Sequence, residues 1–295
     1  MPRPTKRRRS RRFRILSILP VGLVLIAAGA FVYASKAPET LFSPKLTAVS
    51  INEAVKEYRE DPQPRREDIK MPAADKMPVK PAKNLEGFTA PKPGVYSYKT
   101  RGKDWVEYNG QKYVRDFPST TPATVLRSQG CGWELYFQTA KEYTDGHRQC
   151  SAPGEFLCMA HISKIEFGTV KRSMTHTCKP GMVQVGGKAV GPNGHQSTVC
   201  YASHMDKSNI KILFKNTETV TVGGKPVKAY HVELDSAVDG ELNGTAVADV
   251  WFETHTGTYL KMIRKQDTSS KLPDGSTATY RVRVTYELDS LTPRV

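Results

Sequence analysis

The chain has 295 residues, a composition typical of a globular protein and a formal net charge of +15 at pH 7. Eight lysines and arginines and no acidic residue lie in residues 1–14, which leaves a net charge of +7 for the rest of the chain. Because so much of the excess charge sits in a short basic tail, the charge distribution argues against a nucleic-acid-binding domain.

An apolar segment follows the basic tail. Residues 15–34 are twenty consecutive residues without a charged side chain. As a helix this segment matches the roughly 30 Å hydrocarbon core of a membrane, and it exceeds the roughly 7 to 15 apolar residues of a signal peptide. We expect an uncleaved transmembrane anchor, with a cleavable signal or twin-arginine export through SRRFRIL as alternatives. The positive-inside rule then predicts a cytoplasmic tail, which contacts anionic lipid headgroups, and an extracytoplasmic C-terminal domain.

Residues 35–86 are rich in Pro, Lys, Glu and Asp and contain few large apolar residues. Such a segment cannot bury enough surface to offset its chain entropy, so we predict a disordered tether. One short helix is expected inside it, because Ser50 and Glu53 have the spacing of a capping box ahead of AVKEYRE. That helix is too short to be stable by itself.

From residue 87 to residue 295 the hydrophobic pattern has a period of two, which is typical of half-buried antiparallel strands. In TYRVRVTYELDS the polar residues alternate with a predicted inward face formed by Tyr280, Val282, Val284, Tyr286 and Leu288. AYHVELD repeats the pattern, and no convincing helical segment of ten residues is found. We therefore predict an exported all-β domain built as a large curled antiparallel sheet, either an open barrel or a clam-like fold.

All of the cysteines lie in this predicted exported domain: Cys131, Cys150, Cys158, Cys178 and Cys200. Outside the cytoplasm the default state is disulfides, with one thiol left over. A turn near residues 140–141 places Cys131 opposite Cys150, and a turn near residue 189 places Cys178 opposite Cys200. We predict these two disulfides and a free thiol at Cys158.

The hairpin CGWELYFQTAKEYTDGHRQC leaves two questions open. Asp145-Gly146 is also a strong turn signal, and a turn there would move Cys150 out of register with Cys131. Trp133 and Phe137 share a face, and together with Trp251 they form either packed core or a groove for a hydrophobic ligand.

A metal site is the alternative to a disulfide between Cys178 and Cys200. If their strands pair, a zinc-compatible set converges, formed by His176, Cys178, Cys200 and His204. In an oxidising compartment the same cysteines form disulfides instead of binding a metal, so we predict no metal and no cofactor. The sequence has no HExxH, GxSxG or CxxC motif, and we predict no catalytic residue.

A family resemblance rests on several segments: GVYSYKTRG, SQGCGWELYFQ, THTCKPG, KAYHVELD, VWFETHTGTYLKMIRK and YELDSLTPR. Over most of residues 90–295 they resemble uncharacterised, membrane-anchored exported proteins of high-GC Gram-positive bacteria. The WFETHTGTYLK pattern is also similar to LolA-type lipoprotein carriers, whose curved sheets enclose acyl chains, although this chain lacks obvious helices to plug the sheet. The resemblance implies a non-enzymatic envelope protein that binds a lipid or other hydrophobic ligand. An exported enzyme of unrecognised type and a purely structural domain are the alternatives.

Overall fold

The computed structural model describes residues 42–62, 88–128, 130–152, 155–186, 194–202, 206–272 and 274–295. Within these ranges no helix is long and apolar enough to cross a membrane. The predicted anchor at residues 15–34 and the basic tail before it lie outside the described residues.

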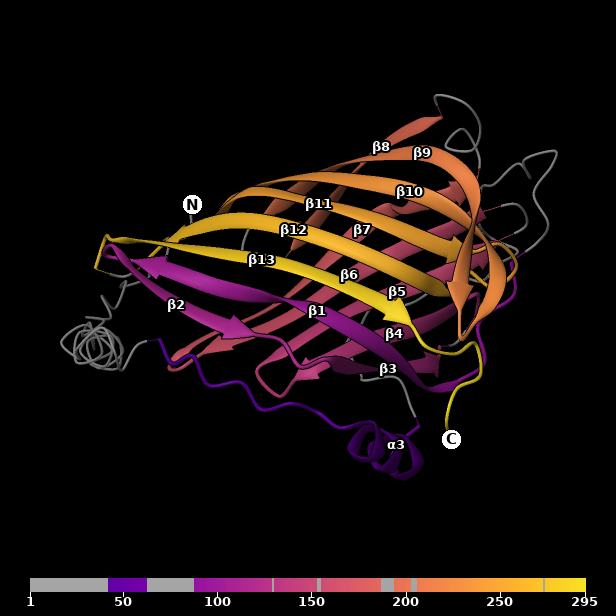
Figure 1. Ribbon diagram of the computed structural model, residues 1–295. Coiled ribbons are helices and arrows are strands. Elements are labelled where there is room, and N and C mark those ends of the chain that lie inside the picture. The colour runs from indigo at the N-terminus through magenta and orange to yellow at the C-terminus, as the bar shows by residue number, and fades with distance from the viewer. Residues whose placement is uncertain are drawn as a thin grey trace, which may run out of the picture. The chain divides into compact units, whose positions relative to one another are not determined.

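In the described part of the chain, 13 strands form one antiparallel sheet (Figure 1). The strands are β1 (Gly94–Tyr108), β2 (Gln111–Asp116), β3 (Thr120–Arg127), β4 (Gly132–Ala140), β5 (Tyr143–Ala152), β6 (Glu155–Phe167), β7 (Val170–Gly186), β8 (His195–Ala202), β9 (Lys207–Val222), β10 (Lys225–Asp239), β11 (Leu242–Glu253), β12 (Tyr259–Lys271) and β13 (Thr277–Leu288). Neighbours in the chain are neighbours in the sheet from β3 to β13. The predicted all-β class and large antiparallel sheet are confirmed.

The sheet closes on itself because β1 also pairs with β13, from Tyr98 opposite Leu288 to Tyr108 opposite Ala278. The other edge of β1 is shared: residues 94–99 pair with β3, and residues 103–108 pair with β2. Each of β13 and β3 to β12 therefore has a partner strand on both sides, although β7 and β8 share only three residue pairs, and the closed sheet surrounds an interior.

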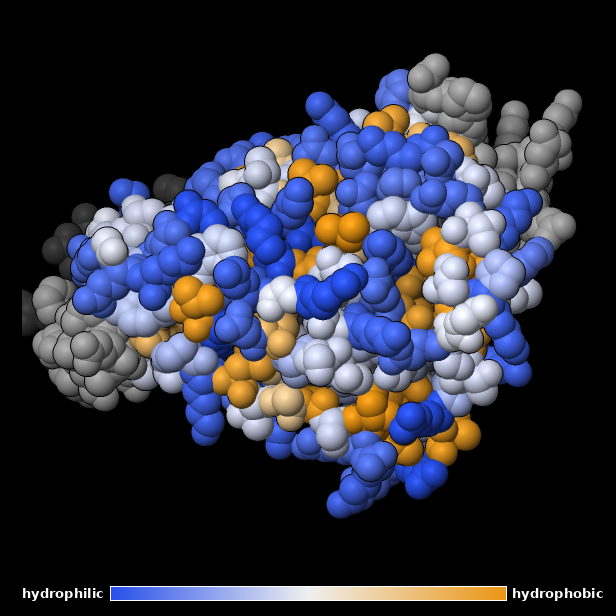
Figure 2. Space-filling model, viewed as in Figure 1, coloured by the Kyte–Doolittle hydropathy of each residue, from blue (hydrophilic) through white to orange (hydrophobic). Residues whose placement is uncertain are grey.

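The period-two pattern decides which side chains face that interior. On β13, Val282, Val284, Tyr286 and Leu288 are all buried, as the alternation predicts. The outward Arg281 and Arg283 both pair with Asp267 on neighbouring β12. Figure 2 shows the result on one outer face, which is mostly hydrophilic with scattered apolar residues.

Part of the predicted tether is ordered. The helix α3 (Ile51–Glu60) begins at Ser50, whose Oγ accepts a hydrogen bond from the backbone N–H of Glu53 at 3.1 Å. The Glu53 carboxylate pairs with Lys141 Nζ at 2.9 Å. Ala54 packs in a buried cluster with Val49 and with Val95 of β1, so tertiary contacts stabilise a helix that is too short to form alone.

We expect Ser50→Ala to weaken this helix by about 1 kcal/mol, because the N–H of Glu53 loses its acceptor. Amide hydrogen exchange in α3 should then be faster by a factor of about five. Ser43→Ala is the control, since it removes a serine upstream of the helix and should leave that exchange unchanged. Equal rates in wild type and Ser50→Ala would show that the cap does not stabilise α3.

One half of the enclosed space is filled with aromatic side chains. Phe137 packs against Tyr98 and Tyr286, with ring centroids 5.0 and 4.8 Å apart. Phe156 similarly contacts Trp133 at 5.3 Å and Phe252 at 5.1 Å. These residues come from the strand halves that lie next to the β9–β10 and β11–β12 turns, whereas several inward positions in the opposite halves of β9 to β11 and β13 hold Ser or Ala.

Candidate functional site

A cavity of about 340 Å³ occupies the other half of the enclosed space. It exists because inward positions there carry small residues, namely Ser208, Ser236, Ala246, Ala248 and Ala278. The volume lies at the lower end of the range of about 300–1,000 Å³ that is usual for small-molecule sites.

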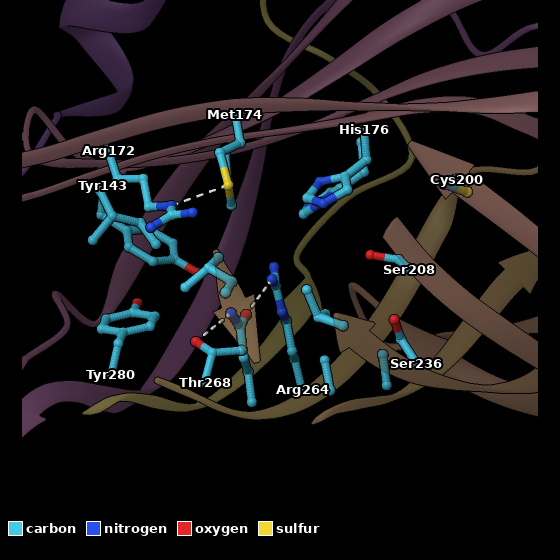
Figure 3. A pocket seen from close by; sticks show the side chains of 18 of the residues that line it. Tyr143, Arg172, Met174, His176, Cys200, Ser208, Ser236, Arg264, Thr268 and Tyr280 are labelled. Atoms are coloured by element: carbon cyan, nitrogen blue, oxygen red, sulfur yellow. Dashed lines mark hydrogen bonds between the residues drawn. The ribbon is translucent and has the colours of Figure 1, made fainter. Parts of the chain in front are cut away.

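Two facing walls of the cavity differ in polarity. Strands β9 to β11 supply an apolar wall that includes Ile210, Leu234 and Val250. The facing wall, here called the polar wall, runs from β5 to β7 and carries three histidines among apolar side chains, while Arg264 comes from β12, which lies beside β11. Figure 3 shows Met174 and His176 pointing into the cavity from one side and Arg264 from the opposite side.

The cavity reaches the surface at the end of the strands. Lys171, near the start of β7, and Lys271, at the end of β12, both line it and are both exposed. Phe42, from the segment before α3, lines the same end and is itself buried. The opening of the cavity therefore lies between these strand ends, beside Phe42.

Three histidines form a row on adjacent strands of the polar wall. His147 of β5 is in register with His161 of β6, and His161 is in register with His176 of β7. Their ring centroids are 5.2 Å apart for His147 and His161, and 6.3 Å apart for His161 and His176. All three line the cavity.

Asp145 lies beside this row and is 1% exposed. Its Oδ1 contacts His161 Nε2 at 2.5 Å, and its Oδ2 accepts from Arg264 Nη1 at 2.5 Å. Burial acts to raise the pKa of Asp145, but the charges of Arg264 and His161 outweigh burial and hold the pKa well below its usual range. The carboxylate is therefore ionised at neutral pH and is balanced by the buried guanidinium.

The outer two histidines of the row are neutral at neutral pH. Burial lowers the pKa of His147 to about 3, and burial followed by the charge of His161 lowers the pKa of His176 to about 4. Neither Nε2 atom has a hydrogen-bond partner among the described residues. Two buried imidazole nitrogens thus face the cavity without a partner, which usually calls for a functional explanation.

Both predicted disulfides are present, linking Cys131 to Cys150 and Cys178 to Cys200. Cys158 is a free, buried thiol, and burial raises its pKa to about 12. It therefore stays protonated at neutral pH and is a poor nucleophile.

The alternative zinc set does not assemble among the described residues. Cys178 and Cys200 of that set form a disulfide with each other and therefore have no thiolate to bind a metal. His204 lies outside the described residues. Only His176 of that set belongs to the histidine row.

The first predicted hairpin turns between β4 and β5, after Ala140, while Asp145 and Gly146 lie within β5. A register shift between Phe137 and Ala140 places Cys150 opposite Gly132, next to its disulfide partner. The turn signal at Asp145-Gly146 is overridden because a continuous β5 pairs with β4 and β6.

None of the predicted groove aromatics lines the cavity. Trp133 and Phe137 are fully buried in the packed core. Trp251 points outward and stacks on His231 with ring centroids 4.1 Å apart. The cavity instead lies where inward side chains are small, so aromatic residues are a poor guide to its position.

Comparisons with known proteins give no match to a family model and none to a curated protein sequence. Among solved structures, the chain is similar to the hypothetical lipoprotein YmcC from Escherichia coli, with 12% identity and a TM-score of 0.31 over 66% of this chain and 85% of that one. A protein described as a lipoprotein candidate from Parabacteroides distasonis is 10% identical, with a TM-score of 0.34 over 70% of this chain and 99% of that one. Both similarities are distant, and neither indicates what this chain binds.

Proposed function

We propose that this chain is a non-enzymatic, membrane-anchored envelope protein whose extracytoplasmic domain binds a lipid or other hydrophobic ligand inside the closed sheet. The observation that carries the proposal is the cavity of about 340 Å³ with its mostly apolar wall from β9 to β11. A ligand that fits has an apolar body, which lies against that wall, and a polar end, which lies near the histidine row or the lysines at the opening.

The two disulfides support an extracytoplasmic location of the domain. Two disulfides are typical of an oxidising compartment and unusual in the cytoplasm. The apolar run at residues 15–34 and the basic tail before it supply a single-pass anchor with a cytoplasmic N-terminus and a site for anionic lipids. The protein would then present its cavity close to the outer surface of the membrane that anchors it.

The test is crosslinking of the full chain in phospholipid vesicles by a palmitic acid analogue that carries a diazirine near its methyl end. We expect crosslinks on the cavity-facing peptides of β7 and β9 to β12. Ala248→Phe places a phenyl ring in the cavity from β11 and should reduce these crosslinks roughly tenfold, the effect of about 1.4 kcal/mol in binding.

Val247→Phe is the matched control, because Val247 is adjacent on β11 and does not line the cavity. It adds the same ring to the outer face and should leave the crosslinks unchanged. Crosslinks confined to residues 15–34 or to the outer face, or equal loss in both variants, would contradict ligand binding inside the sheet.

A further inference from the structure

We propose that Asp145, His147 and His161 form a binding site for one divalent transition-metal ion of the zinc class on the polar wall of the cavity, with the fourth position facing His176. This site shares the cavity with the hydrophobic ligand of the preceding section, but ion binding can be measured without that ligand. It uses the carboxylate and the imidazoles that the fold brings together from β5, β6 and β7.

The donor atoms are close enough to share one ion. One ligand atom from each of Asp145, His147 and His161 lies within 4.8 Å of the other two. His161 Nε2 and Asp145 Oδ1 are 2.5 Å apart, and His147 Nε2 and Asp145 Oδ2 are 3.9 Å apart. Zinc bonds of about 2.0–2.2 Å in tetrahedral geometry place ligand atoms roughly 3.4 Å apart, so small side-chain rotations suffice.

The chemistry of the donors suits zinc and related ions. Imidazole nitrogen and carboxylate oxygen are ordinary zinc ligands, and a histidine must be neutral to donate its lone pair. The Nε2 of His147 lines the cavity side of the row and has no hydrogen-bond partner among the described residues, so its lone pair is available to an ion. Asp145 offers Oδ1 as the oxygen ligand, because its Oδ2 is held by Arg264.

Arg264 has the position of a group that orients a metal ligand. Its Nη1 binds Asp145 Oδ2, and its Nη2 donates to Gln266 Oε1 at 2.6 Å. The guanidinium thus fixes the carboxylate while leaving Oδ1 directed toward His161. Carboxylates that bind metal ions are commonly held by such outer hydrogen bonds.

His176 gives an independent indication that something binds here. It is 7% exposed and lines the cavity next to His161, and its Nε2 is without a hydrogen-bond partner in the described part of the chain. Figure 3 shows its ring pointing into the cavity. An ion held by the other three residues gives this imidazole a partner, either directly or through a metal-bound water.

The experiment uses the full chain in detergent, purified without a histidine tag and stripped with a chelator. Cobalt is titrated and followed by its visible absorption, and zinc is measured by equilibrium dialysis with elemental analysis. We expect one ion per chain. His147→Gln and His161→Ala should each weaken binding at least roughly 100-fold, since loss of an outer partner alone costs about 10- to 100-fold.

His231→Ala is the matched control. His231 on the outer face also contacts two carboxylates, with Nδ1 3.3 Å from Glu218 Oε1 and Nε2 2.9 Å from Asp249 Oδ1. Its replacement should leave ion binding unchanged. Absence of binding to wild type, binding that survives both cavity variants, or loss of binding in His231→Ala would each overturn the proposal.

Chemical modification of histidines in the wild-type protein tests the same site without requiring that a variant folds. Diethylpyrocarbonate modifies accessible imidazoles, and mass spectrometry locates the modified residue. Zinc should protect His161, whose side chain is 27% exposed, and should leave His231 reactive. Equal modification of His161 with and without zinc would also overturn the proposal.

Discussion

Arg115→Met is expected to destabilise the protein by about 3 to 5 kcal/mol, because it leaves a buried carboxylate without its partner. Arg115 of β2 binds Asp104 of β1 through two contacts, Nε to Oδ1 at 2.9 Å and Nη2 to Oδ2 at 2.6 Å. Both side chains are 0% exposed. The guanidinium also donates to the backbone carbonyl of Glu166 and lies over the ring of Phe167, so it links β2 to β6.

The loss should depend on pH. Burial raises the pKa of Asp104 even beside Arg115, whose hydrogen bond and charge act in the opposite direction. Without Arg115 the pKa in the folded state rises further above the unfolded value of about 3.9, so the folded state binds more protons. Stability of the variant should therefore fall, relative to wild type, as the pH rises above about 4, and the loss should be larger at pH 8 than at pH 5.

Urea denaturation of the full chain at the two pH values measures this effect. The double variant Asp104→Leu/Arg115→Met removes both charges and should recover most of the lost free energy of unfolding. Arg101→Met breaks an exposed pair with Glu287, where the arginine side chain is 73% exposed, and should cost less than about 1 kcal/mol. Equal stability of Arg115→Met and Arg101→Met would show that the buried pair does not stabilise the closure of the sheet.

Removal of the second disulfide by Cys178→Ala/Cys200→Ala is expected to cost about 3 kcal/mol, the chain-entropy value for a loop of this length. The sequence separation of the two cysteines is 22 residues. The disulfide lies at the weakest junction of the sheet, since β7 and β8 pair only over His176–Ala202, Thr177–Tyr201 and Cys178–Cys200. Both half-cystines also line the cavity, so its wall loses support when they are separated.

Two measurements follow this loss: urea denaturation for the free energy of unfolding and hydrogen exchange for the location of the change. Exchange should accelerate most in β8. Cys158→Ala is the control, because it removes a buried thiol and leaves both disulfides intact. Unchanged exchange in β8 after loss of the disulfide would show that pairing with β9 alone holds that strand.

Much of the fold is predictable because a strand that is half buried has a period of two in its sequence. The alternation at residues 280–288 predicted both a strand and its inward face, and the structure confirms both. Cysteine spacing predicted both disulfides, because a hairpin brings residues at equal distances from its turn together. The ordering of residues 42–62 was not predictable, since it depends on contacts with a sheet formed much later in the chain.

The clustering of the three histidines was not predicted from the sequence. His147 and His161 lie at nearly equal distances from Pro153-Gly154, and His161 and His176 lie at equal distances from Gly168-Thr169. This symmetry about two turn signals was available in the sequence, but it becomes a cluster only if both hairpins have the right register. A shift of one residue would turn each histidine to the other face.

The sequence by itself determined the strand periodicity, the helix cap at Ser50, the cysteine pairing and an apolar segment ahead of the domain, because each depends on residues that are close along the chain or symmetric about one turn. Only the tertiary structure decided that β1 closes the sheet against β13, that one half of its interior is packed and the other hollow, and that Asp145 meets two histidines and Arg264. These features depend on contacts between residues far apart in the chain, 119 positions for Asp145 and Arg264 and 190 for Tyr98 and Leu288, and the register of many strands must be set before such contacts exist. The cavity and the proposed metal site belong to this second group.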